Sequence, residues 1–120
     1  ALAHTIGVRY AQPHGLVCGV LLPHIMTFNL PLVEEKYAAL AVAAGVVPPG
    51  TEAGTAAERF VAYVRRLVEK LGLPSGIGAL GVKEEDIEEL VEATLPANSL
   101  KANPRRITRP ELHEILRQAL

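Results

Sequence analysis

Residues 14–29 read HGLVCGVLLPHIMTFN, an almost wholly apolar run that contains Pro23. Such a run predicts either a buried helix or a buried strand, because periodicity alone does not separate the two. Its length and the proline inside it favour the buried helix. We expect Pro23 to remove one backbone hydrogen bond and to kink this helix near Leu22.

The segments on both sides of this run also predict helices. Residues 1–6 are interpreted as the last turns of a helix that Gly7 ends. Leu30-Pro31 is expected to begin a further helix, which Gly45 ends.

Three amphipathic helices are predicted in the rest of the chain, over residues 55–71, 84–94 and 108–119. Thr55 with Glu58, and Thr108 with Glu111, have the spacing of capping boxes. PSGIGALG, residues 74–81, is predicted to be a plain turn, since it lacks the pattern of a phosphate-binding loop. No segment alternates polar and apolar residues with a period of two. The sequence therefore predicts an all-α fold, a compact bundle of five to six helices in a single domain over residues 1–120.

Composition excludes several classes of function. The chain has 120 residues, a formal net charge of -1 and 4% aromatic residues, so neither charge nor stacking surfaces favour binding to nucleic acid. The single cysteine, Cys18, excludes an intrachain disulfide. No signal peptide is evident, and no apolar run is expected to approach the roughly 18 to 20 residues needed to span a bilayer. We therefore expect a cytoplasmic protein with no membrane partner.

Three of the four histidines lie in the first 24 residues, at His4, His14 and His24. His14 follows Pro13 at the expected start of the apolar helix, where the helix dipole favours the neutral imidazole that binds metals. A helix-loop-helix could bring His4 to the same cavity, whereas His24 is expected to point elsewhere on the helix. The alternative, which spacing alone favours, is that His14 bonds locally at a helix end.

Two candidate ligands do not complete a metal site, since catalytic zinc and open iron sites use about three protein ligands. No Asp or Glu occurs between Ala1 and Val33. Cys18 lies four residues after His14, which would suit a thiol nucleophile, but its apolar setting favours a packing role. We therefore expect the chain alone to bind metal weakly.

The string HTIGVRYAQPHGLVCGVLLPHIMTFN resembles the histidine-rich signature of iron-containing alcohol dehydrogenases, part of the dehydroquinate-synthase-like superfamily. The residues that match it at the proper intervals are His4, Gly7, Pro13-His14-Gly15, Leu22-Pro23 and Phe28-Asn29. VEKLGLP, GVKEEDIEEL and the turn at Asn103-Pro104-Arg105 also resemble the family, so the likeness covers essentially the whole chain.

The resemblance implies the C-terminal helical half of an enzyme that moves hydride between an alcohol or aldehyde and NAD or NADP. In that family one aspartate and three histidines bind a divalent metal, commonly Fe²⁺ and sometimes Zn²⁺. His14 matches the last of these histidine ligands. His4 matches a histidine that lines the active site near the metal and nicotinamide, a catalytic position suited to relaying the substrate proton.

The other ligands would lie before Ala1, which also lacks an N-cap residue ahead of it. We therefore expect a fragment without its N-terminal dinucleotide-binding domain, which would be its partner and would carry most of the cofactor site. Alone, such a fragment should be inactive. Two alternatives remain: a non-enzymatic helical interaction module that self-associates, and a small metal-binding protein that completes its site as a homo-oligomer.

Overall fold

Six α-helices and two short 3₁₀ turns make up the fold, and no strand is present, so the predicted all-α class is confirmed. The computed structural model describes all 120 residues. In chain order the elements are α1 (Leu2–Arg9), α2 (His14–Ala43), α3 (Ala53–Lys70), η1 (Ile77–Leu80), η2 (Glu84–Asp86), α4 (Ile87–Thr94), α5 (Asn98–Lys101) and α6 (Arg109–Ala119).

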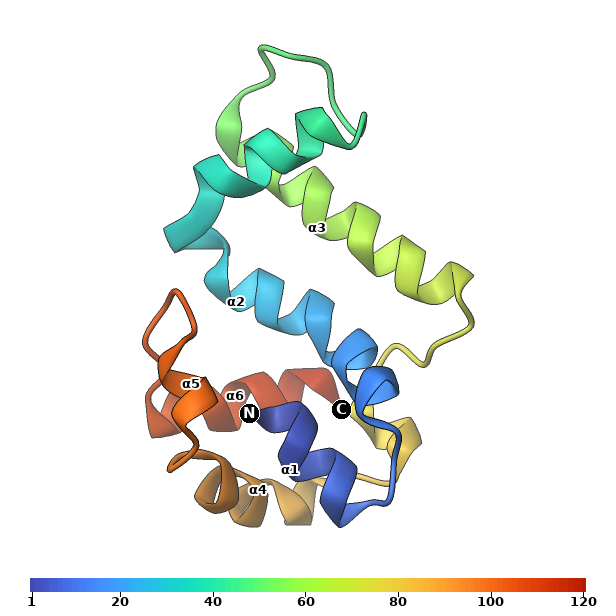
Figure 1. Cartoon of the computed structure of the whole chain (residues 1–120), viewed down its shortest axis with the longest axis vertical. Helices are drawn as coiled ribbons and strands as arrows, with labels where there is room; N and C mark the ends of the chain where they lie inside the picture. The colour runs from blue at the N-terminus through green and yellow to red at the C-terminus, as the bar shows by residue number, and fades with distance from the viewer.

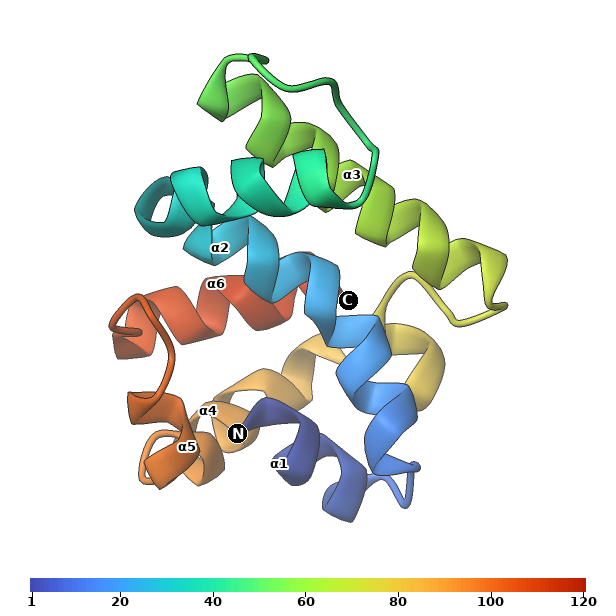
Figure 2. The ribbon, with the colours of Figure 1, turned by 45° about the horizontal axis from the view of Figure 1, so that its top comes forward.

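The long helix α2 connects the two ends of the molecule (Figure 1). Its first half packs against α1 and α6 and runs antiparallel to α3, while its second half crosses the start of α3, where Tyr37 packs on Phe60. The helix α4 closes the lower end by packing against both α1 and α6. The same arrangement is seen from a second direction in Figure 2, where α1 and the start of α2 form a helical hairpin.

The break in α2 lies at Val33, whose φ of -119° and ψ of 23° are not helical, and not near Leu22 as predicted. Pro31, two residues earlier, has no N–H for the carbonyl of Thr27 and so weakens the helix at this point. Beyond Val33 the helix turns to pack on α3. At Pro23, by contrast, the buried residues Val20, Leu21 and Met26 hold α2 in one direction. The further helix expected from Leu30-Pro31 is therefore the second half of α2, which begins beyond the break at Val33 rather than at Pro31.

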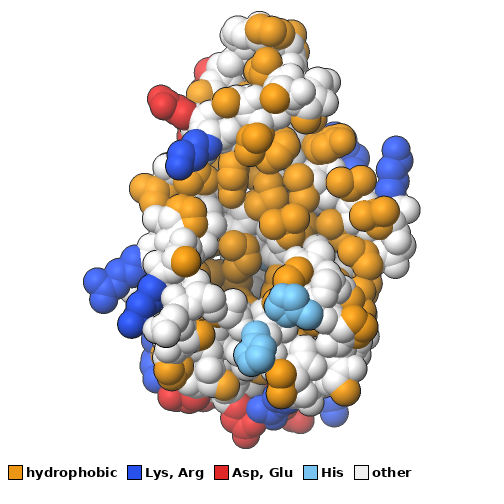
Figure 3. All heavy atoms as spheres, viewed as in Figure 1, with side chains coloured by type: hydrophobic (Ala, Val, Ile, Leu, Met, Phe, Trp, Pro, Cys, Tyr) orange, Lys and Arg blue, Asp and Glu red, His pale blue; other side chains and the backbone are white.

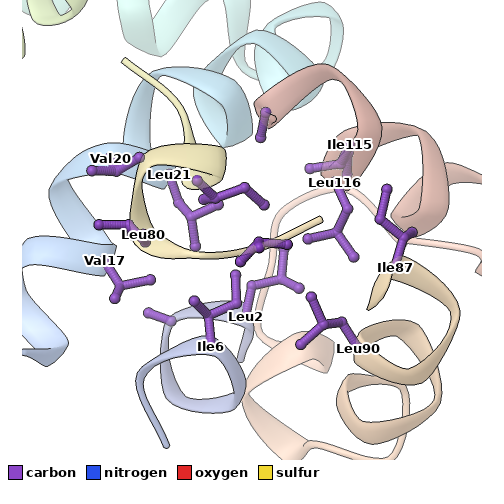
Figure 4. Close-up of a cluster of buried hydrophobic side chains, with 14 of the residues drawn as sticks. Leu2, Ile6, Val17, Val20, Leu21, Leu80, Ile87, Leu90, Ile115 and Leu116 are labelled. Carbon is purple, nitrogen blue, oxygen red and sulfur yellow. The ribbon is translucent and has the colours of Figure 1, made fainter. Parts of the chain in front are cut away.

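The main core lies at the lower end of the molecule and contains 16 buried residues from α1, α2, α4, α6 and the turns between them. Figure 4 shows Ile6, Val17, Leu90 and Leu116 converging on one another from four different helices. All four side chains are completely buried. Because Val17 is one turn from His14, this core fixes the position of the first turn of α2.

The connection between α1 and α2 differs from the prediction at Gly7. The helix α1 continues to Arg9, and the chain reverses at Ala11, whose φ of 52° is left-handed. Gly7 lies inside the helix, where its carbonyl accepts a hydrogen bond from the N–H of Gln12 at 3.0 Å. A Cβ at Gly7 would lie 3.2 Å from the Gln12 carbonyl oxygen, so the glycine allows this close return of the chain rather than ending the helix.

One of the two predicted capping boxes is confirmed. Thr108 accepts a hydrogen bond from the N–H of Glu111, and the Glu111 carboxylate accepts one from the N–H of Thr108. The predicted box at Thr55 and Glu58 is wrong, because α3 begins three residues earlier, with Glu52 as its N-cap. The Glu52 carboxylate accepts hydrogen bonds from the N–H groups of Thr55 and Gly54, and these hold its pKa below the ordinary value of 4.5.

Two glycines within residues 74–81 allow this segment to pack closely against the end of α6. A Cβ at Gly76 would lie 2.5 Å from the carbonyl oxygen of Leu120, and one at Gly78 would lie 2.8 Å from the same atom. Only glycines let this segment pass so close to the end of α6, where Gly78 also donates a hydrogen bond to Leu120.

A polar network attaches the segment after α5 to the middle of α2. Asn29, which is buried, and Asn103 exchange side-chain hydrogen bonds of 2.9 Å and 2.7 Å. Arg105 donates to the carbonyl of Phe28 at 2.8 Å, and its guanidinium lies 4.1 Å from the centre of the Phe28 ring. These contacts hold residues 98–107 against the apolar helix.

By length and composition α2 would be able to cross a membrane, since an 18-residue window has a mean hydropathy of 1.8. The expectation that no apolar run reaches spanning length was therefore wrong. In this structure 33% of that window is buried, by packing on other helices. The absence of a membrane partner stays a prediction.

Candidate metal-binding site

His14 is the first residue of α2, and its imidazole is exposed to solvent. Pro13 forms the N-cap, and its carbonyl accepts a hydrogen bond from the N–H of Val17 at 3.2 Å. The sequence prediction of a helix start after Pro13 is thus confirmed. The imidazole is supported by a rigid helix and is free on its outer side to bind a ligand.

Cys18 lies one helical turn after His14, and its Sγ is 3.4 Å from Nε2 of His14. The cysteine is exposed, so the expected packing role for it was wrong. The apolar run surrounds Cys18 in sequence, but its side chain lies on the outer face of α2, whereas Val17 and Val20 face the core. His14 and Cys18 together present one nitrogen and one sulfur donor at the surface.

An apolar cavity of about 260 Å³ begins beside Cys18. Its walls come from α1, α2 and the segment that begins with α5, and they include Leu2, Leu22, Ile25, Ser99 and Leu100. The Asn29–Asn103 pair helps to hold that last segment in place. Ser99 and Asn103 are the polar residues of this mostly apolar wall, and composition alone did not identify the cavity.

His4 is exposed on α1 and lines a different depression with Thr5, Val8 and Leu90. His14 lines none of the five main cavities, so none of them contains both His4 and His14. His4 and His14 lie on α1 and α2, and these two helices pack directly against each other.

The other two histidines have local partners. Nε2 of His24 lies 3.0 Å from the carbonyl oxygen of Ser75, which gives it a structural role in joining α2 to the turn before η1. His113 lies 3.9 Å from a carboxylate oxygen of Glu88. No group of three or more His, Cys, Asp or Glu side chains is arranged to hold a metal ion.

Sequence reasoning missed a polar cleft of about 410 Å³ between α2, α3 and α6. His24, Arg65 and Glu111 contribute to its walls, and Arg65 donates a hydrogen bond to Thr27 at 3.1 Å. These residues are far apart in sequence and form no local motif, so only the tertiary structure brings them together.

A broad apolar surface covers α2 and α3 on the face shown in Figure 3. Leu32 is 60% exposed and Leu71 is 67% exposed, and Leu22, Leu40 and Leu67 are also exposed. Histidine side chains lie on the same face, below this surface (Figure 3).

The whole chain, residues 1–120, matches the family described as the Fe-containing alcohol dehydrogenase family, C-terminal. The chain is 38% identical to 1,3-propanediol dehydrogenase of Klebsiella pneumoniae over 119 residues, which is 99% of this chain and 31% of that protein. It is 34% identical to NAD-dependent methanol dehydrogenase of Bacillus methanolicus, over 100% of this chain and 32% of that protein. The chain thus spans about a third of the length of these curated relatives.

Solved structures show the same fold. A crystal structure of 1,3-propanediol oxidoreductase superposes with a TM-score of 0.93 at 37% identity, covering 99% of this chain and 31% of that chain. Alcohol dehydrogenase from Oenococcus oeni superposes with a TM-score of 0.92 at 33% identity, with the same coverage. The six helices therefore correspond to one helical part of larger dehydrogenases.

Proposed function

The chain belongs to the Fe-containing alcohol dehydrogenase family, as its C-terminal domain, and on that premise we propose that it forms the metal and substrate side of an NAD(P)-dependent alcohol dehydrogenase. The assembled enzyme would transfer hydride between an alcohol or aldehyde and the nicotinamide. The observation that carries the proposal is the match over all 120 residues, with His14 exposed at the start of α2.

His14 is proposed as one ligand of a divalent cation, Fe²⁺ or Zn²⁺. The donor fits, because an exposed imidazole at a fixed helix start offers Nε2 without displacing core side chains. When bound, the cation supplies Lewis-acid polarisation of the substrate oxygen. The remaining ligands would come from residues outside this chain.

His4 is proposed to relay the substrate proton. Its imidazole is exposed on α1 and takes part in none of the hydrogen bonds or ion pairs of the molecule, so both ring nitrogens are free to exchange protons. The packing of α1 against α2 and α4 would hold the ring in place during this exchange.

The apolar cavity beside Cys18 is proposed to receive the carbon chain of the substrate. Its volume of about 260 Å³ lies below the range of about 300–1,000 Å³ that is usual for drug-sized ligands. Leu22, Ile25 and Leu100 would exclude water from this chain, whereas Ser99 would be free to contact a polar group. These walls favour a short aliphatic alcohol or aldehyde.

NAD or NADP would be bound mainly by a dinucleotide-binding domain that packs against this chain. The exposed apolar side chains of α2 and α3 support this inference, since exposed apolar patches often mark interfaces. The same observation favours the second candidate function, a self-associating helical module without enzymatic activity.

A chimera tests the proposal. This chain would replace the matching 31% of the Klebsiella pneumoniae 1,3-propanediol dehydrogenase, and NAD(P)⁺ reduction would be measured with a series of short alcohols. We expect turnover by the chimera with added Fe²⁺ or Zn²⁺, and none by the 120-residue chain alone.

Two results would count against this function. A folded, metal-loaded chimera without turnover would contradict it, especially if light scattering showed that the isolated chain forms stable oligomers. Turnover by the isolated chain would contradict the need for a dinucleotide-binding partner.

A further inference from the structure

We propose that Asn29 is a positioning residue that limits the length of the alcohol or aldehyde that this chain accepts. It acts through Asn103, by holding residues 98–107 in place as one wall of the apolar cavity beside Cys18. Asn29 itself lines none of the five main cavities. The inference deepens the proposed function and rests on it for the identity of the ligand.

The wall segment, residues 98–107, borders two separate cavities. One is the apolar cavity of about 260 Å³, and the other has a volume of about 540 Å³. Leu100, Asn103 and Ile107 line both of them. The short helix α5 within the segment buries none of its residues, and of the whole segment only Ile107 packs against the main core. The position of this wall therefore depends on polar contacts.

Asn29 and Asn103 hold the middle of the wall by a reciprocal pair of hydrogen bonds. Nδ2 of Asn29 donates to Oδ1 of Asn103 at 2.9 Å, and Nδ2 of Asn103 donates to Oδ1 of Asn29 at 2.7 Å. Asn29 is only 5% exposed. Because a buried amide that loses its partner keeps the full cost of its desolvation, the paired arrangement is favoured over a wall that stands away from α2.

Arg105 is a second attachment of the same wall to the same place on α2. It donates a hydrogen bond to the carbonyl of Phe28, the residue next to Asn29, and its guanidinium lies 4.1 Å from the centre of the Phe28 ring. Loss of the amide of Asn29 therefore leaves the wall attached through Arg105. The part that becomes free to move is the stretch at Asn103, which borders the cavity.

The position of the wall determines which carbon chains fit. The rest of the cavity is built from α1 and α2, where Leu2 and Leu21 are buried in the main core and stay in place. Movement of Asn103 and Leu100 thus widens the cavity from one side only. In an apolar pocket one methylene group changes the discrimination between substrates by about 10–200-fold. A small movement of this wall therefore alters the choice of ligand.

Binding of straight-chain primary alcohols, from ethanol to hexanol, tests this inference without requiring turnover. Each alcohol would be titrated into the isotope-labelled chain, and its Kd would be taken from the NMR shifts of the Ser99 and Leu100 amides, which border the cavity. The same alcohols would give kcat/KM for the chimera. Asn29→Ala, Asn103→Ala and the double variant would be compared with Asn98→Ala, which removes the same amide from an exposed residue of α5.

For the unmodified chain we expect affinity to rise by about 4-fold with each added methylene until the cavity is full and then to fall, since burial of one methylene contributes about 0.8 kcal/mol. Asn29→Ala and Asn103→Ala should each lower the discrimination against the first alcohol that is too long by about 10-fold or more. The double variant should match the single ones, because the two amides act as one unit. Asn98→Ala should keep the unmodified profile.

The inference would be overturned by a folded Asn29→Ala chain with the unmodified length profile, or by an equal loss of affinity for every alcohol, which indicates a merely structural role. Absence of alcohol binding to the unmodified chain would also overturn it. If circular dichroism shows that Asn29→Ala is unfolded, Asn103→Ala decides by the same criteria. An inactive chimera would contradict only the proposed enzyme if the isolated chain shows the shifted profile, whereas an active chimera with unchanged profiles would contradict only the role of Asn29.

Discussion

Replacing His14 with alanine should lower kcat/KM of the chimera by about 100-fold or more, since a Lewis acid supplies several kcal/mol of charge stabilisation in the transition state. The substitution removes an exposed side chain from the first turn of α2, and the core residue Val17 stays in place. Fold and cofactor binding should therefore survive while bound metal is lost. Metal analysis and steady-state kinetics on the same preparation would measure both effects.

His113→Ala is the matched control for this loss, since it removes an imidazole of α6 that lies 3.9 Å from a carboxylate oxygen of Glu88. Its metal content and turnover should equal those of the unmodified chimera. A His14→Ala chimera that kept its metal and its activity would show that His14 is only a residue at a helix start.

Leu116→Ala should lower the free energy of unfolding by about 3–5 kcal/mol, the upper part of the range for leucine truncation in well-packed cores. The Leu116 side chain is completely buried where α6 meets α1, α2 and α4 (Figure 4). Since domains of this size unfold with about 5–15 kcal/mol, the loss is a large part of the total. Urea unfolding followed by circular dichroism would measure it.

Leu32→Ala makes the same chemical change at a side chain that is 60% exposed, and it should alter the free energy of unfolding by no more than about 0.5 kcal/mol. Equal effects of the two substitutions would mean that the lower core is not the main source of stability in this chain.

The helices could be predicted largely from local signals. The amphipathic spacing after Thr108, its capping box with Glu111 and the start of α2 after Pro13 each depend on residues within one or two turns. The errors arose where a second local signal competed. Thr55 and Glu58 have the spacing of a capping box, but the N-cap of α3 is Glu52. Its carboxylate accepts hydrogen bonds from the N–H groups of Gly54 and Thr55.

The break in α2 could not be predicted from its prolines alone. Both Pro23 and Pro31 remove a backbone donor, but only tertiary packing determines which of them the helix tolerates. The buried residues around Pro23 hold the helix straight, whereas packing on α3 redirects it after Val33.

The candidate site was predictable in part. His14 was found from its place after Pro13 and from the family signature, and the structure gives it the exposed position that a ligand needs. The exposure of Cys18 was not predicted, because an apolar sequence run does not reveal which of its side chains faces outward. The cavity beside Cys18 requires residues from α5 that follow in sequence by about 80 positions, and no local pattern connects them.

Anomalous diffraction from crystals of the metal-loaded chimera tests the central claim most directly. The account predicts one ion bound by Nε2 of His14, at about 2.0–2.1 Å if the metal is zinc. An ion bound elsewhere in an active chimera, with the His14 imidazole free, would contradict it.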